Sequence, residues 1–170
     1  MSEFQDVLAG SRSDNTPDAL NLFGQFAGQW DFEWIDGKGT ERERHITGEW
    51  IFSWILEGQA IQDVFICPSR QERLINPQPD AEYGTTVRFY NSKKGKWDIC
   101  YGYLNHMTVL EAEQIGENIV LTNQNPSEGI NQWIFSEITP TTFHWQNRTS
   151  TDGGGTWRVN GELYAIRRQK

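Results

Sequence analysis

Large aromatic and apolar residues alternate with polar ones in short runs along most of this chain. The clearest run carries Trp50, Phe52 and Trp54 on one parity and Glu49 and Ser53 on the other. Successive side chains of a β-strand point to opposite faces, so a period of two predicts strands with one apolar face. All eight tryptophans lie in such runs, and the sequence therefore predicts strands that turn aromatic rings toward a common interior.

About ten such runs follow one another between residues 29 and 167, separated by short segments rich in Gly, Asn, Asp and Pro. These residues favour tight turns, and no helix-length segment interrupts the series. Strands joined by short turns are antiparallel, and closing the sheet removes its exposed edges. We therefore predict an all-β fold, an antiparallel up-and-down β-barrel of about 8–10 strands. Residues 67–82, the longest irregular stretch, are predicted to form a mobile loop at the barrel mouth.

The N-terminal part is predicted to differ from the rest. Residues 1–15 are polar and are expected to form a flexible arm, while residues 16–170 form a single barrel domain. Thr16 followed by Pro17 and Asp18 predicts a helix start, with the threonine as N-cap. The spacing of the apolar residues that follow predicts two or three turns, ending near Gly28 and closing one end of the barrel.

The segment Gly28-Gln29-Trp30 resembles the G-x-W opening of lipocalins and of the wider calycin superfamily. In those barrels the tryptophan closes the floor and an arginine of the last strand packs over it, which implies that Arg167 packs over Trp30 here. Four further segments resemble a family of bacterial lipocalin-like proteins of unknown function. They are residues 50–54, 60–64, 83–90 and 152–157. The resemblance implies a fold and no assigned chemistry.

The charge balance and the absence of targeting segments limit the partners. A net charge of −8 argues against nucleic acid and against an anionic membrane surface, which attract clustered Lys and Arg. No apolar stretch reaches the roughly 18 residues of a membrane span, and no signal peptide is recognisable. We expect a cytoplasmic protein with Cys67 and Cys100 as reduced thiols. A homodimer is left open.

No metal or cofactor motif is present, and we expect no cofactor. His45, His106 and His144 are far apart and lack paired ligand spacing, so surface or hydrogen-bonded histidines are the favoured interpretation. A haem-binding barrel with His106 or His144 as axial ligand is a minor alternative. Nucleophile and phosphate-loop motifs are also missing, and the glycines at 153–155 are interpreted as a hairpin turn.

Three residues are candidates for acid–base chemistry. Asp63 lies between Ile61 and Phe65 on one strand face, and a carboxylate among apolar groups has its pKa raised. Arg88 could pair with this acid or hold an anionic ligand group, and His106 would complete a polar cluster. The alternative, which we favour, is that Asp63, Arg88 and His106 face solvent or form a structural ion pair.

Seven aromatic residues are candidates for the wall of a binding site: Trp34, Trp50, Trp54, Tyr101, Tyr103, Trp133 and Trp145. They either fill the barrel or line a partly open cavity, and we favour the cavity because buried indole N–H groups need partners. The inward faces of the last three strands stay ambiguous.

A small hydrophobic or aromatic metabolite is therefore the expected partner, bound inside the barrel by contacts with the aromatic side chains. The alternative is a cofactor-free enzyme, a cyclase, isomerase or lyase that uses an acid or base in the cavity. A structural or protein-binding module would be favoured if the barrel interior were solid.

Overall fold

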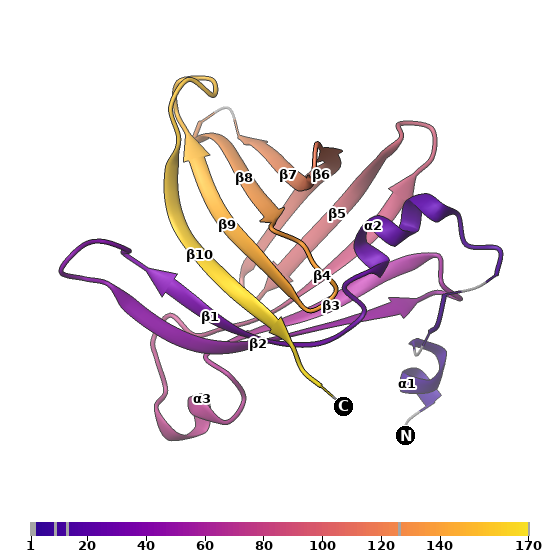
Figure 1. Ribbon diagram of the computed structural model, residues 1–170, viewed down its shortest axis with the longest axis horizontal. Helices are drawn as coiled ribbons and strands as arrows, with labels where there is room; N and C mark the ends of the chain where they lie inside the picture. Colours follow the sequence, from indigo (N-terminus) through magenta and orange to yellow (C-terminus); the bar gives the residue numbers. More distant parts are fainter. Residues whose placement is uncertain (1–2, 9, 13, 126, 170) are drawn as a thin grey trace.

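The computed structural model describes residues 3–8, 10–12, 14–125 and 127–169, without the side chains of residues 7, 124 and 125. Ten β-strands dominate the fold (Figure 1). They are β1 (Gly28–Asp36), β2 (Arg44–Ile55), β3 (Ala60–Cys67), β4 (Glu82–Asn91), β5 (Lys96–Tyr103), β6 (His106–Ile115), β7 (Asn118–Asn125), β8 (Gly129–Ser136), β9 (Thr142–Ser150) and β10 (Arg158–Arg167).

Each strand pairs antiparallel with its neighbours in sequence, and β1 also pairs with β10, so the sheet is a closed barrel. Trp30 illustrates the closure, because it lies opposite Trp50 of β2 on one side and opposite Arg167 of β10 on the other. The prediction of an up-and-down barrel is confirmed. In the closed barrel each strand has a neighbouring strand on both sides, as expected for a meander of short hairpins.

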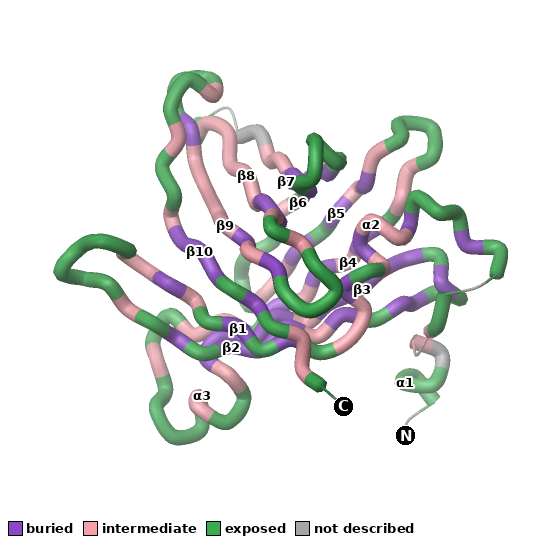
Figure 2. Tube along the Cα trace, viewed as in Figure 1, coloured by how far each residue is buried: buried purple, intermediate pink, exposed green. Residues whose placement is uncertain are grey.

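Buried and more exposed residues alternate along the strands, whereas the hairpin between β1 and β2 is largely exposed (Figure 2). On β5 the alternation buries Trp97, Ile99 and Tyr101, whose side chains share one face. The alternation in the sequence thus corresponds to side chains that point alternately into the barrel and out to its surface.

The helix before β1 is shorter than predicted. Residues Asp18–Leu20 form a 3₁₀ turn, η1, which continues into a single α-helical turn, α2 (Asn21–Gly24). The Thr16 hydroxyl does not cap this helix; it donates a hydrogen bond to the carbonyl of Gly58. The two short elements nonetheless carry Leu20 and Phe23 into the core, where Phe23 lies edge-on to Trp97.

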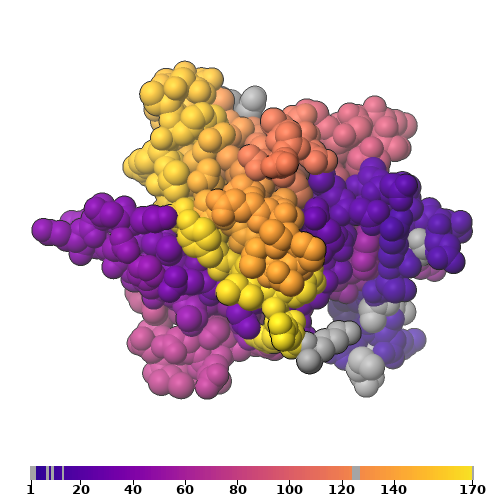
Figure 3. All heavy atoms as spheres, viewed as in Figure 1, coloured from indigo at the N-terminus to yellow at the C-terminus, as the bar shows by residue number. Residues whose placement is uncertain are grey.

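The N-terminal arm, predicted to be flexible, contains a short helix, α1 (Glu3–Leu8), and a backbone bridge between Gly10 and Trp54. Residues 1, 2, 9 and 13 of this arm lie outside the described residues. None of the helices among the described residues is long and apolar enough to cross a membrane. Figure 3 shows the N-terminal segment (indigo) packed against one side of the barrel, with the hairpin after β1 projecting from the opposite side.

The floor of the barrel is built from Trp30 and Arg167, as the resemblance to calycins implied. The guanidinium carbon of Arg167 lies 4.1 Å from the centroid of the Trp30 ring, and the indole N–H donates to the carbonyl of Phe26. Arg167 also donates hydrogen bonds to the carbonyls of Gln25 and Ala27. A Cβ at Gly28 would lie 2.7 Å from this guanidinium, and its φ of +133° also favours glycine.

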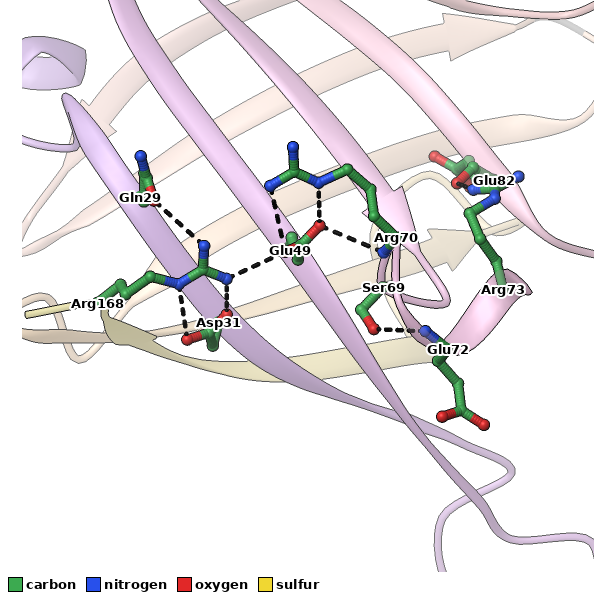
Figure 4. A network of polar contacts seen from close by, with 9 residues as sticks. All are labelled: Gln29, Asp31, Glu49, Ser69, Arg70, Glu72, Arg73, Glu82 and Arg168. Carbon is green, nitrogen blue, oxygen red and sulfur yellow. Dashed lines mark hydrogen bonds and ion pairs between the residues drawn. The ribbon is translucent and has the colours of Figure 1, made fainter. Parts of the chain in front are cut away.

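The loop between β3 and β4 carries a third short helix, α3 (Glu72–Ile75), and ion pairs join it to the outside of the barrel. Glu49 of β2 accepts a hydrogen bond of 2.7 Å from Arg70 of the loop and one of 3.1 Å from Arg168 (Figure 4). Asp80 pairs with Arg44 of β2. The predicted mobility of this loop stays a prediction, but these contacts give it a defined position at the barrel mouth.

Candidate functional site

The barrel interior contains a cavity of about 190 Å³ above a closed, solid floor. Six of the seven aromatic candidates line it: Trp34, Trp50, Tyr101, Tyr103, Trp133 and Trp145. Their rings are close to one another, with 5.2 Å between the centroids of Tyr101 and Trp133 and 5.8 Å between those of Trp34 and Trp145. The interior is therefore partly packed and partly open, and the open part is walled by aromatic rings.

Trp54 does not line this cavity, in contrast to its predicted role. It points inward as predicted, but it lies at the closed end, where its ring covers Gly24 so tightly that a Cβ there would lie 2.1 Å from it. The reason is its position along the barrel axis. Trp30 of the floor lies opposite Trp50, and Trp54 follows four residues later on the same strand, on the side of the floor away from the cavity.

The ambiguity of the last strands is resolved by their pairing. Phe143 and Trp145 face inward, and His144 faces outward, where it contacts Ser136 and Glu162 at 3.1 and 2.8 Å. His144 is thus not an axial ligand for a group inside the barrel. A register shift between Val159 and Gly161 changes the parity of β10, and Trp157, just before this strand, packs its ring on Arg148 outside the cavity.

Asp63 and Arg88 form an ion pair inside the barrel. Nη1 of Arg88 lies 2.5 Å from Oδ2 of Asp63, and both side chains are at most 1% exposed. Arg88 lines the inner end of the cavity, while Asp63 lies behind it and does not. The guanidinium is also 4.9 Å from the ring of Phe23 and 5.3 Å from that of Phe52, so the pair is enclosed by aromatic side chains.

His106, the third member of the predicted polar cluster, lies at the opposite end of the cavity. Its side chain is exposed at the mouth, at the start of β6, with its ring 5.6 Å from that of Tyr103. The structure therefore divides the three candidates into a buried ion pair at the inner end and a histidine at the entrance.

Glu82 is a cavity residue that the sequence analysis missed. It is the first residue of β4, and it accepts a hydrogen bond from the Tyr101 hydroxyl. Burial raises the pKa of the Glu82 carboxyl. The pKa of Tyr101 is also raised, first by burial and second by the negative charge of the neighbouring Glu82. Glu82 shares strand parity with Gly84 and Thr86, which would have indicated an inward-facing side chain. It was instead assigned to the predicted loop of residues 67–82.

A second cavity of about 160 Å³ adjoins the first beneath the β3–β4 loop. The two share Trp34, Phe65 and Glu82, and half of the residues that line the second are polar or charged, among them Arg44 and Asp80. Cys67 also lines it, but burial raises the pKa of this thiol to about 12, so it is not a nucleophile near neutral pH. Among the described residues, no three His, Cys, Asp or Glu side chains are placed to hold a metal ion.

Glu82 and Glu49 are expected to respond to pH in opposite ways. Because folding raises the pKa of Glu82, its ionised form destabilises the fold once pH rises above about 4.5. Glu82→Gln should therefore raise the free energy of unfolding near pH 7 and change it little near pH 3. Urea unfolding followed by tryptophan fluorescence across this range measures the effect.

Glu49→Gln is the matched control for that experiment. Hydrogen bonds from Arg70 and Arg168 lower the pKa of Glu49 to about 2, so its stabilising effect is present above pH 4.5 and is lost as pH falls toward 2. This substitution should cost about 2 kcal/mol near neutral pH, after allowance for solvent screening of the arginines. Two variants that shifted stability in the same direction at neutral pH would contradict the assignment.

Two solved structures have a similar fold. The S-type phycobiliprotein lyase CPES from Guillardia theta superposes with a TM-score of 0.60 at 10% identity, over 88% of this chain and 92% of that one. The fold is a lipocalin-like barrel. Rv2717c from M. tuberculosis superposes with a TM-score of 0.54, also at 10% identity, over 91% of this chain and all of the other. No protein-family model and no curated protein sequence matches the chain.

Similarity to these lipocalin-like barrels extends to the fold and not to the side chains. At 10% identity the likeness to either structure shows the fold alone. The same fold hosts unrelated functions, so the function has to be argued from the cavity itself.

Proposed function

We propose that this barrel binds a small, flat, hydrophobic or aromatic molecule. The supporting observation is the arrangement of six aromatic side chains around an open cavity that also has a few polar groups on its wall. Rings of this kind offer large apolar surfaces and favour edge-to-face or offset contact with a flat ligand. A few polar groups among apolar walls are typical of small-molecule sites.

The volume of the cavity limits the ligand. About 190 Å³ is near the ~150 Å³ that accommodates a benzene ring, and below the roughly 300–1,000 Å³ of sites for drug-sized molecules. One ring or a small fused system therefore fits inside. A longer ligand would have to extend past Trp34 and Glu82 into the adjoining polar cavity.

Trp133→Ala is expected to weaken the binding of a small aromatic probe about tenfold. The ring of Trp133 lies between those of Tyr101 and Trp145, so its loss removes one wall of the site. Isothermal titration calorimetry with naphthalene and indole measures the effect. Trp157→Ala is the control, because Trp157 packs on Arg148 outside the cavity and its loss should leave affinity unchanged. If neither probe bound the unaltered protein, the proposal would be wrong.

A second candidate, acid–base catalysis in the cavity, is favoured by Glu82. A carboxyl group with a raised pKa, hydrogen-bonded to Tyr101 in an aromatic cavity, has the properties of a general acid or base. The lyase among the structures of similar fold is compatible with this candidate without supporting it directly. Native mass spectrometry after incubation with a cell extract separates the two. If the protein is a binding protein, the bound small molecule has the same mass in the unaltered protein and in Glu82→Gln. If it is an enzyme, bound substrate is found only in the variant.

A further inference from the structure

The buried polar side-chain atoms that make no hydrogen bond are concentrated around the cavity. Among the described residues, such side-chain atoms belong to Trp50, Asp63, Arg88 and Trp145. Three of these residues line the cavity, and the fourth, Asp63, is ion-paired to Arg88. Buried polar groups are normally hydrogen-bonded, so exceptions confined to one place indicate a site whose partner comes from outside the chain.

The unpartnered groups on the cavity wall are all donors. Trp50 and Trp145 each contribute an indole N–H, and Arg88 contributes N–H groups that make no hydrogen bond, although its Nη1 is ion-paired with Asp63. The two tryptophan rings are 93 to 95% buried and meet edge to face, with their centroids 6.1 Å apart. Trp30 provides the contrast, because its N–H donates to the carbonyl of Phe26 and serves the floor. A ligand that satisfies these donors must therefore present a hydrogen-bond acceptor.

The charges around the cavity select a neutral acceptor. Asp63, behind the wall, already compensates the cation of Arg88 at 2.5 Å, and the carboxyl group that lines the cavity among the described residues is that of Glu82. An anionic ligand would be brought close to Glu82, and the described residues that line the cavity include no Lys and no second Arg to offset the loss of its hydration. A carbonyl oxygen, by contrast, accepts hydrogen bonds from N–H groups without bringing a net charge into the cavity.

We propose that the ligand is a neutral aromatic compound with a carbonyl-type acceptor, which receives hydrogen bonds from Trp50 and Trp145 while its ring lies among the aromatic walls. This inference rests on the proposed function and adds the chemical class of the ligand. It also explains why tryptophan occupies these two positions, where phenylalanine would fill the barrel without a polar atom to satisfy.

Three probes of similar shape test the proposal on the unaltered protein by calorimetry. Acetophenone carries a carbonyl oxygen where α-methylstyrene carries a methylene group, and benzoate carries a carboxylate. Acetophenone should bind about tenfold more tightly than α-methylstyrene, although it is the less hydrophobic of the two, and at least tenfold more tightly than benzoate.

A spectroscopic readout identifies the donors. In ¹H–¹⁵N correlation spectra, the indole N–H resonances of Trp50 and Trp145 should move downfield with acetophenone and not with α-methylstyrene. Trp145→Phe should remove most of the preference for acetophenone while α-methylstyrene still binds. Trp133→Phe is the matched control, because Trp133 lines the same cavity but its N–H is not among the unpartnered buried atoms, so the preference should persist.

The possible outcomes separate this inference from the proposed function. If α-methylstyrene binds as tightly as acetophenone, or benzoate binds most tightly, the carbonyl inference is overturned and the aromatic binding site stands. If the two indole resonances do not move with acetophenone bound, the donors are wrongly assigned. If none of the probes binds, both proposals fail.

Discussion

Replacing Asp63 with alanine is expected to lower the free energy of unfolding by about 3–5 kcal/mol, because Arg88 would remain as a buried cation without its carboxylate. Both side chains are at most 1% exposed, and aromatic rings enclose the guanidinium on two sides. The cation that remains would therefore be poorly hydrated. Urea unfolding followed by tryptophan fluorescence measures the loss as a lower midpoint with an unchanged slope.

The double variant Asp63→Leu with Arg88→Met is the control for this prediction. Buried ion pairs replaced by apolar residues of similar volume are often neutral or stabilising, so the double variant should recover most of the stability that Asp63→Ala loses. A single substitution that cost less than about 1 kcal/mol would show that Arg88 reaches another partner or solvent. A double variant as unstable as the single one would show that packing, and not charge, sets the cost.

Trp30→Ala is expected to cost about 3–5 kcal/mol, the range for removing a large buried aromatic side chain. The ring is 1% exposed, lies 4.7 Å from that of Phe143 and is covered by Arg167. Its loss would leave a void at the floor and remove the surface against which the guanidinium packs. The effect should appear as a fall of the thermal unfolding midpoint by about ten degrees or more for a chain of this length.

Trp157→Ala is again the useful comparison, because it removes the same side chain from outside the barrel. Its ring lies 4.1 Å from the Arg148 guanidinium carbon, a contact worth about 0.5–2 kcal/mol. The cost should accordingly be near 1 kcal/mol. Equal costs for the two substitutions would contradict the assignment of Trp30 as the floor of the fold.

Strand parity was the part of the candidate site that the sequence could predict. Ile61, Asp63 and Phe65 share an inward face, as do Thr86 and Arg88, because side chains alternate along any strand whatever its neighbours are. The same rule failed at Trp157, where a register shift in β10 breaks the alternation. Irregularities of this kind depend on the pairing between strands and leave no mark on the hydrophobic pattern.

Height along the barrel axis could not be predicted. Trp50 and Trp54 share a strand and a face, yet Trp50 lines the cavity and Trp54 lies against Gly24 of α2. Likewise Arg88 meets Asp63 at the inner end while His106 lies at the mouth. These heights follow from the register of ten strand pairs around a closed sheet, and each register is fixed by contacts between residues far apart in sequence.

The sequence by itself determined that this chain forms an antiparallel barrel with aromatic rings inside, because periodicity and turn residues act locally and the strands are sequential neighbours. It also identified the pairing of Trp30 with Arg167 at the floor, by resemblance. Only the tertiary structure decided where the solid floor ends and the cavity begins, which placed Glu82 against Tyr101 and left the N–H groups of Trp50 and Trp145 without partners. Volume and hydrogen-bond satisfaction are properties of packing around a closed sheet, and no single strand carries them.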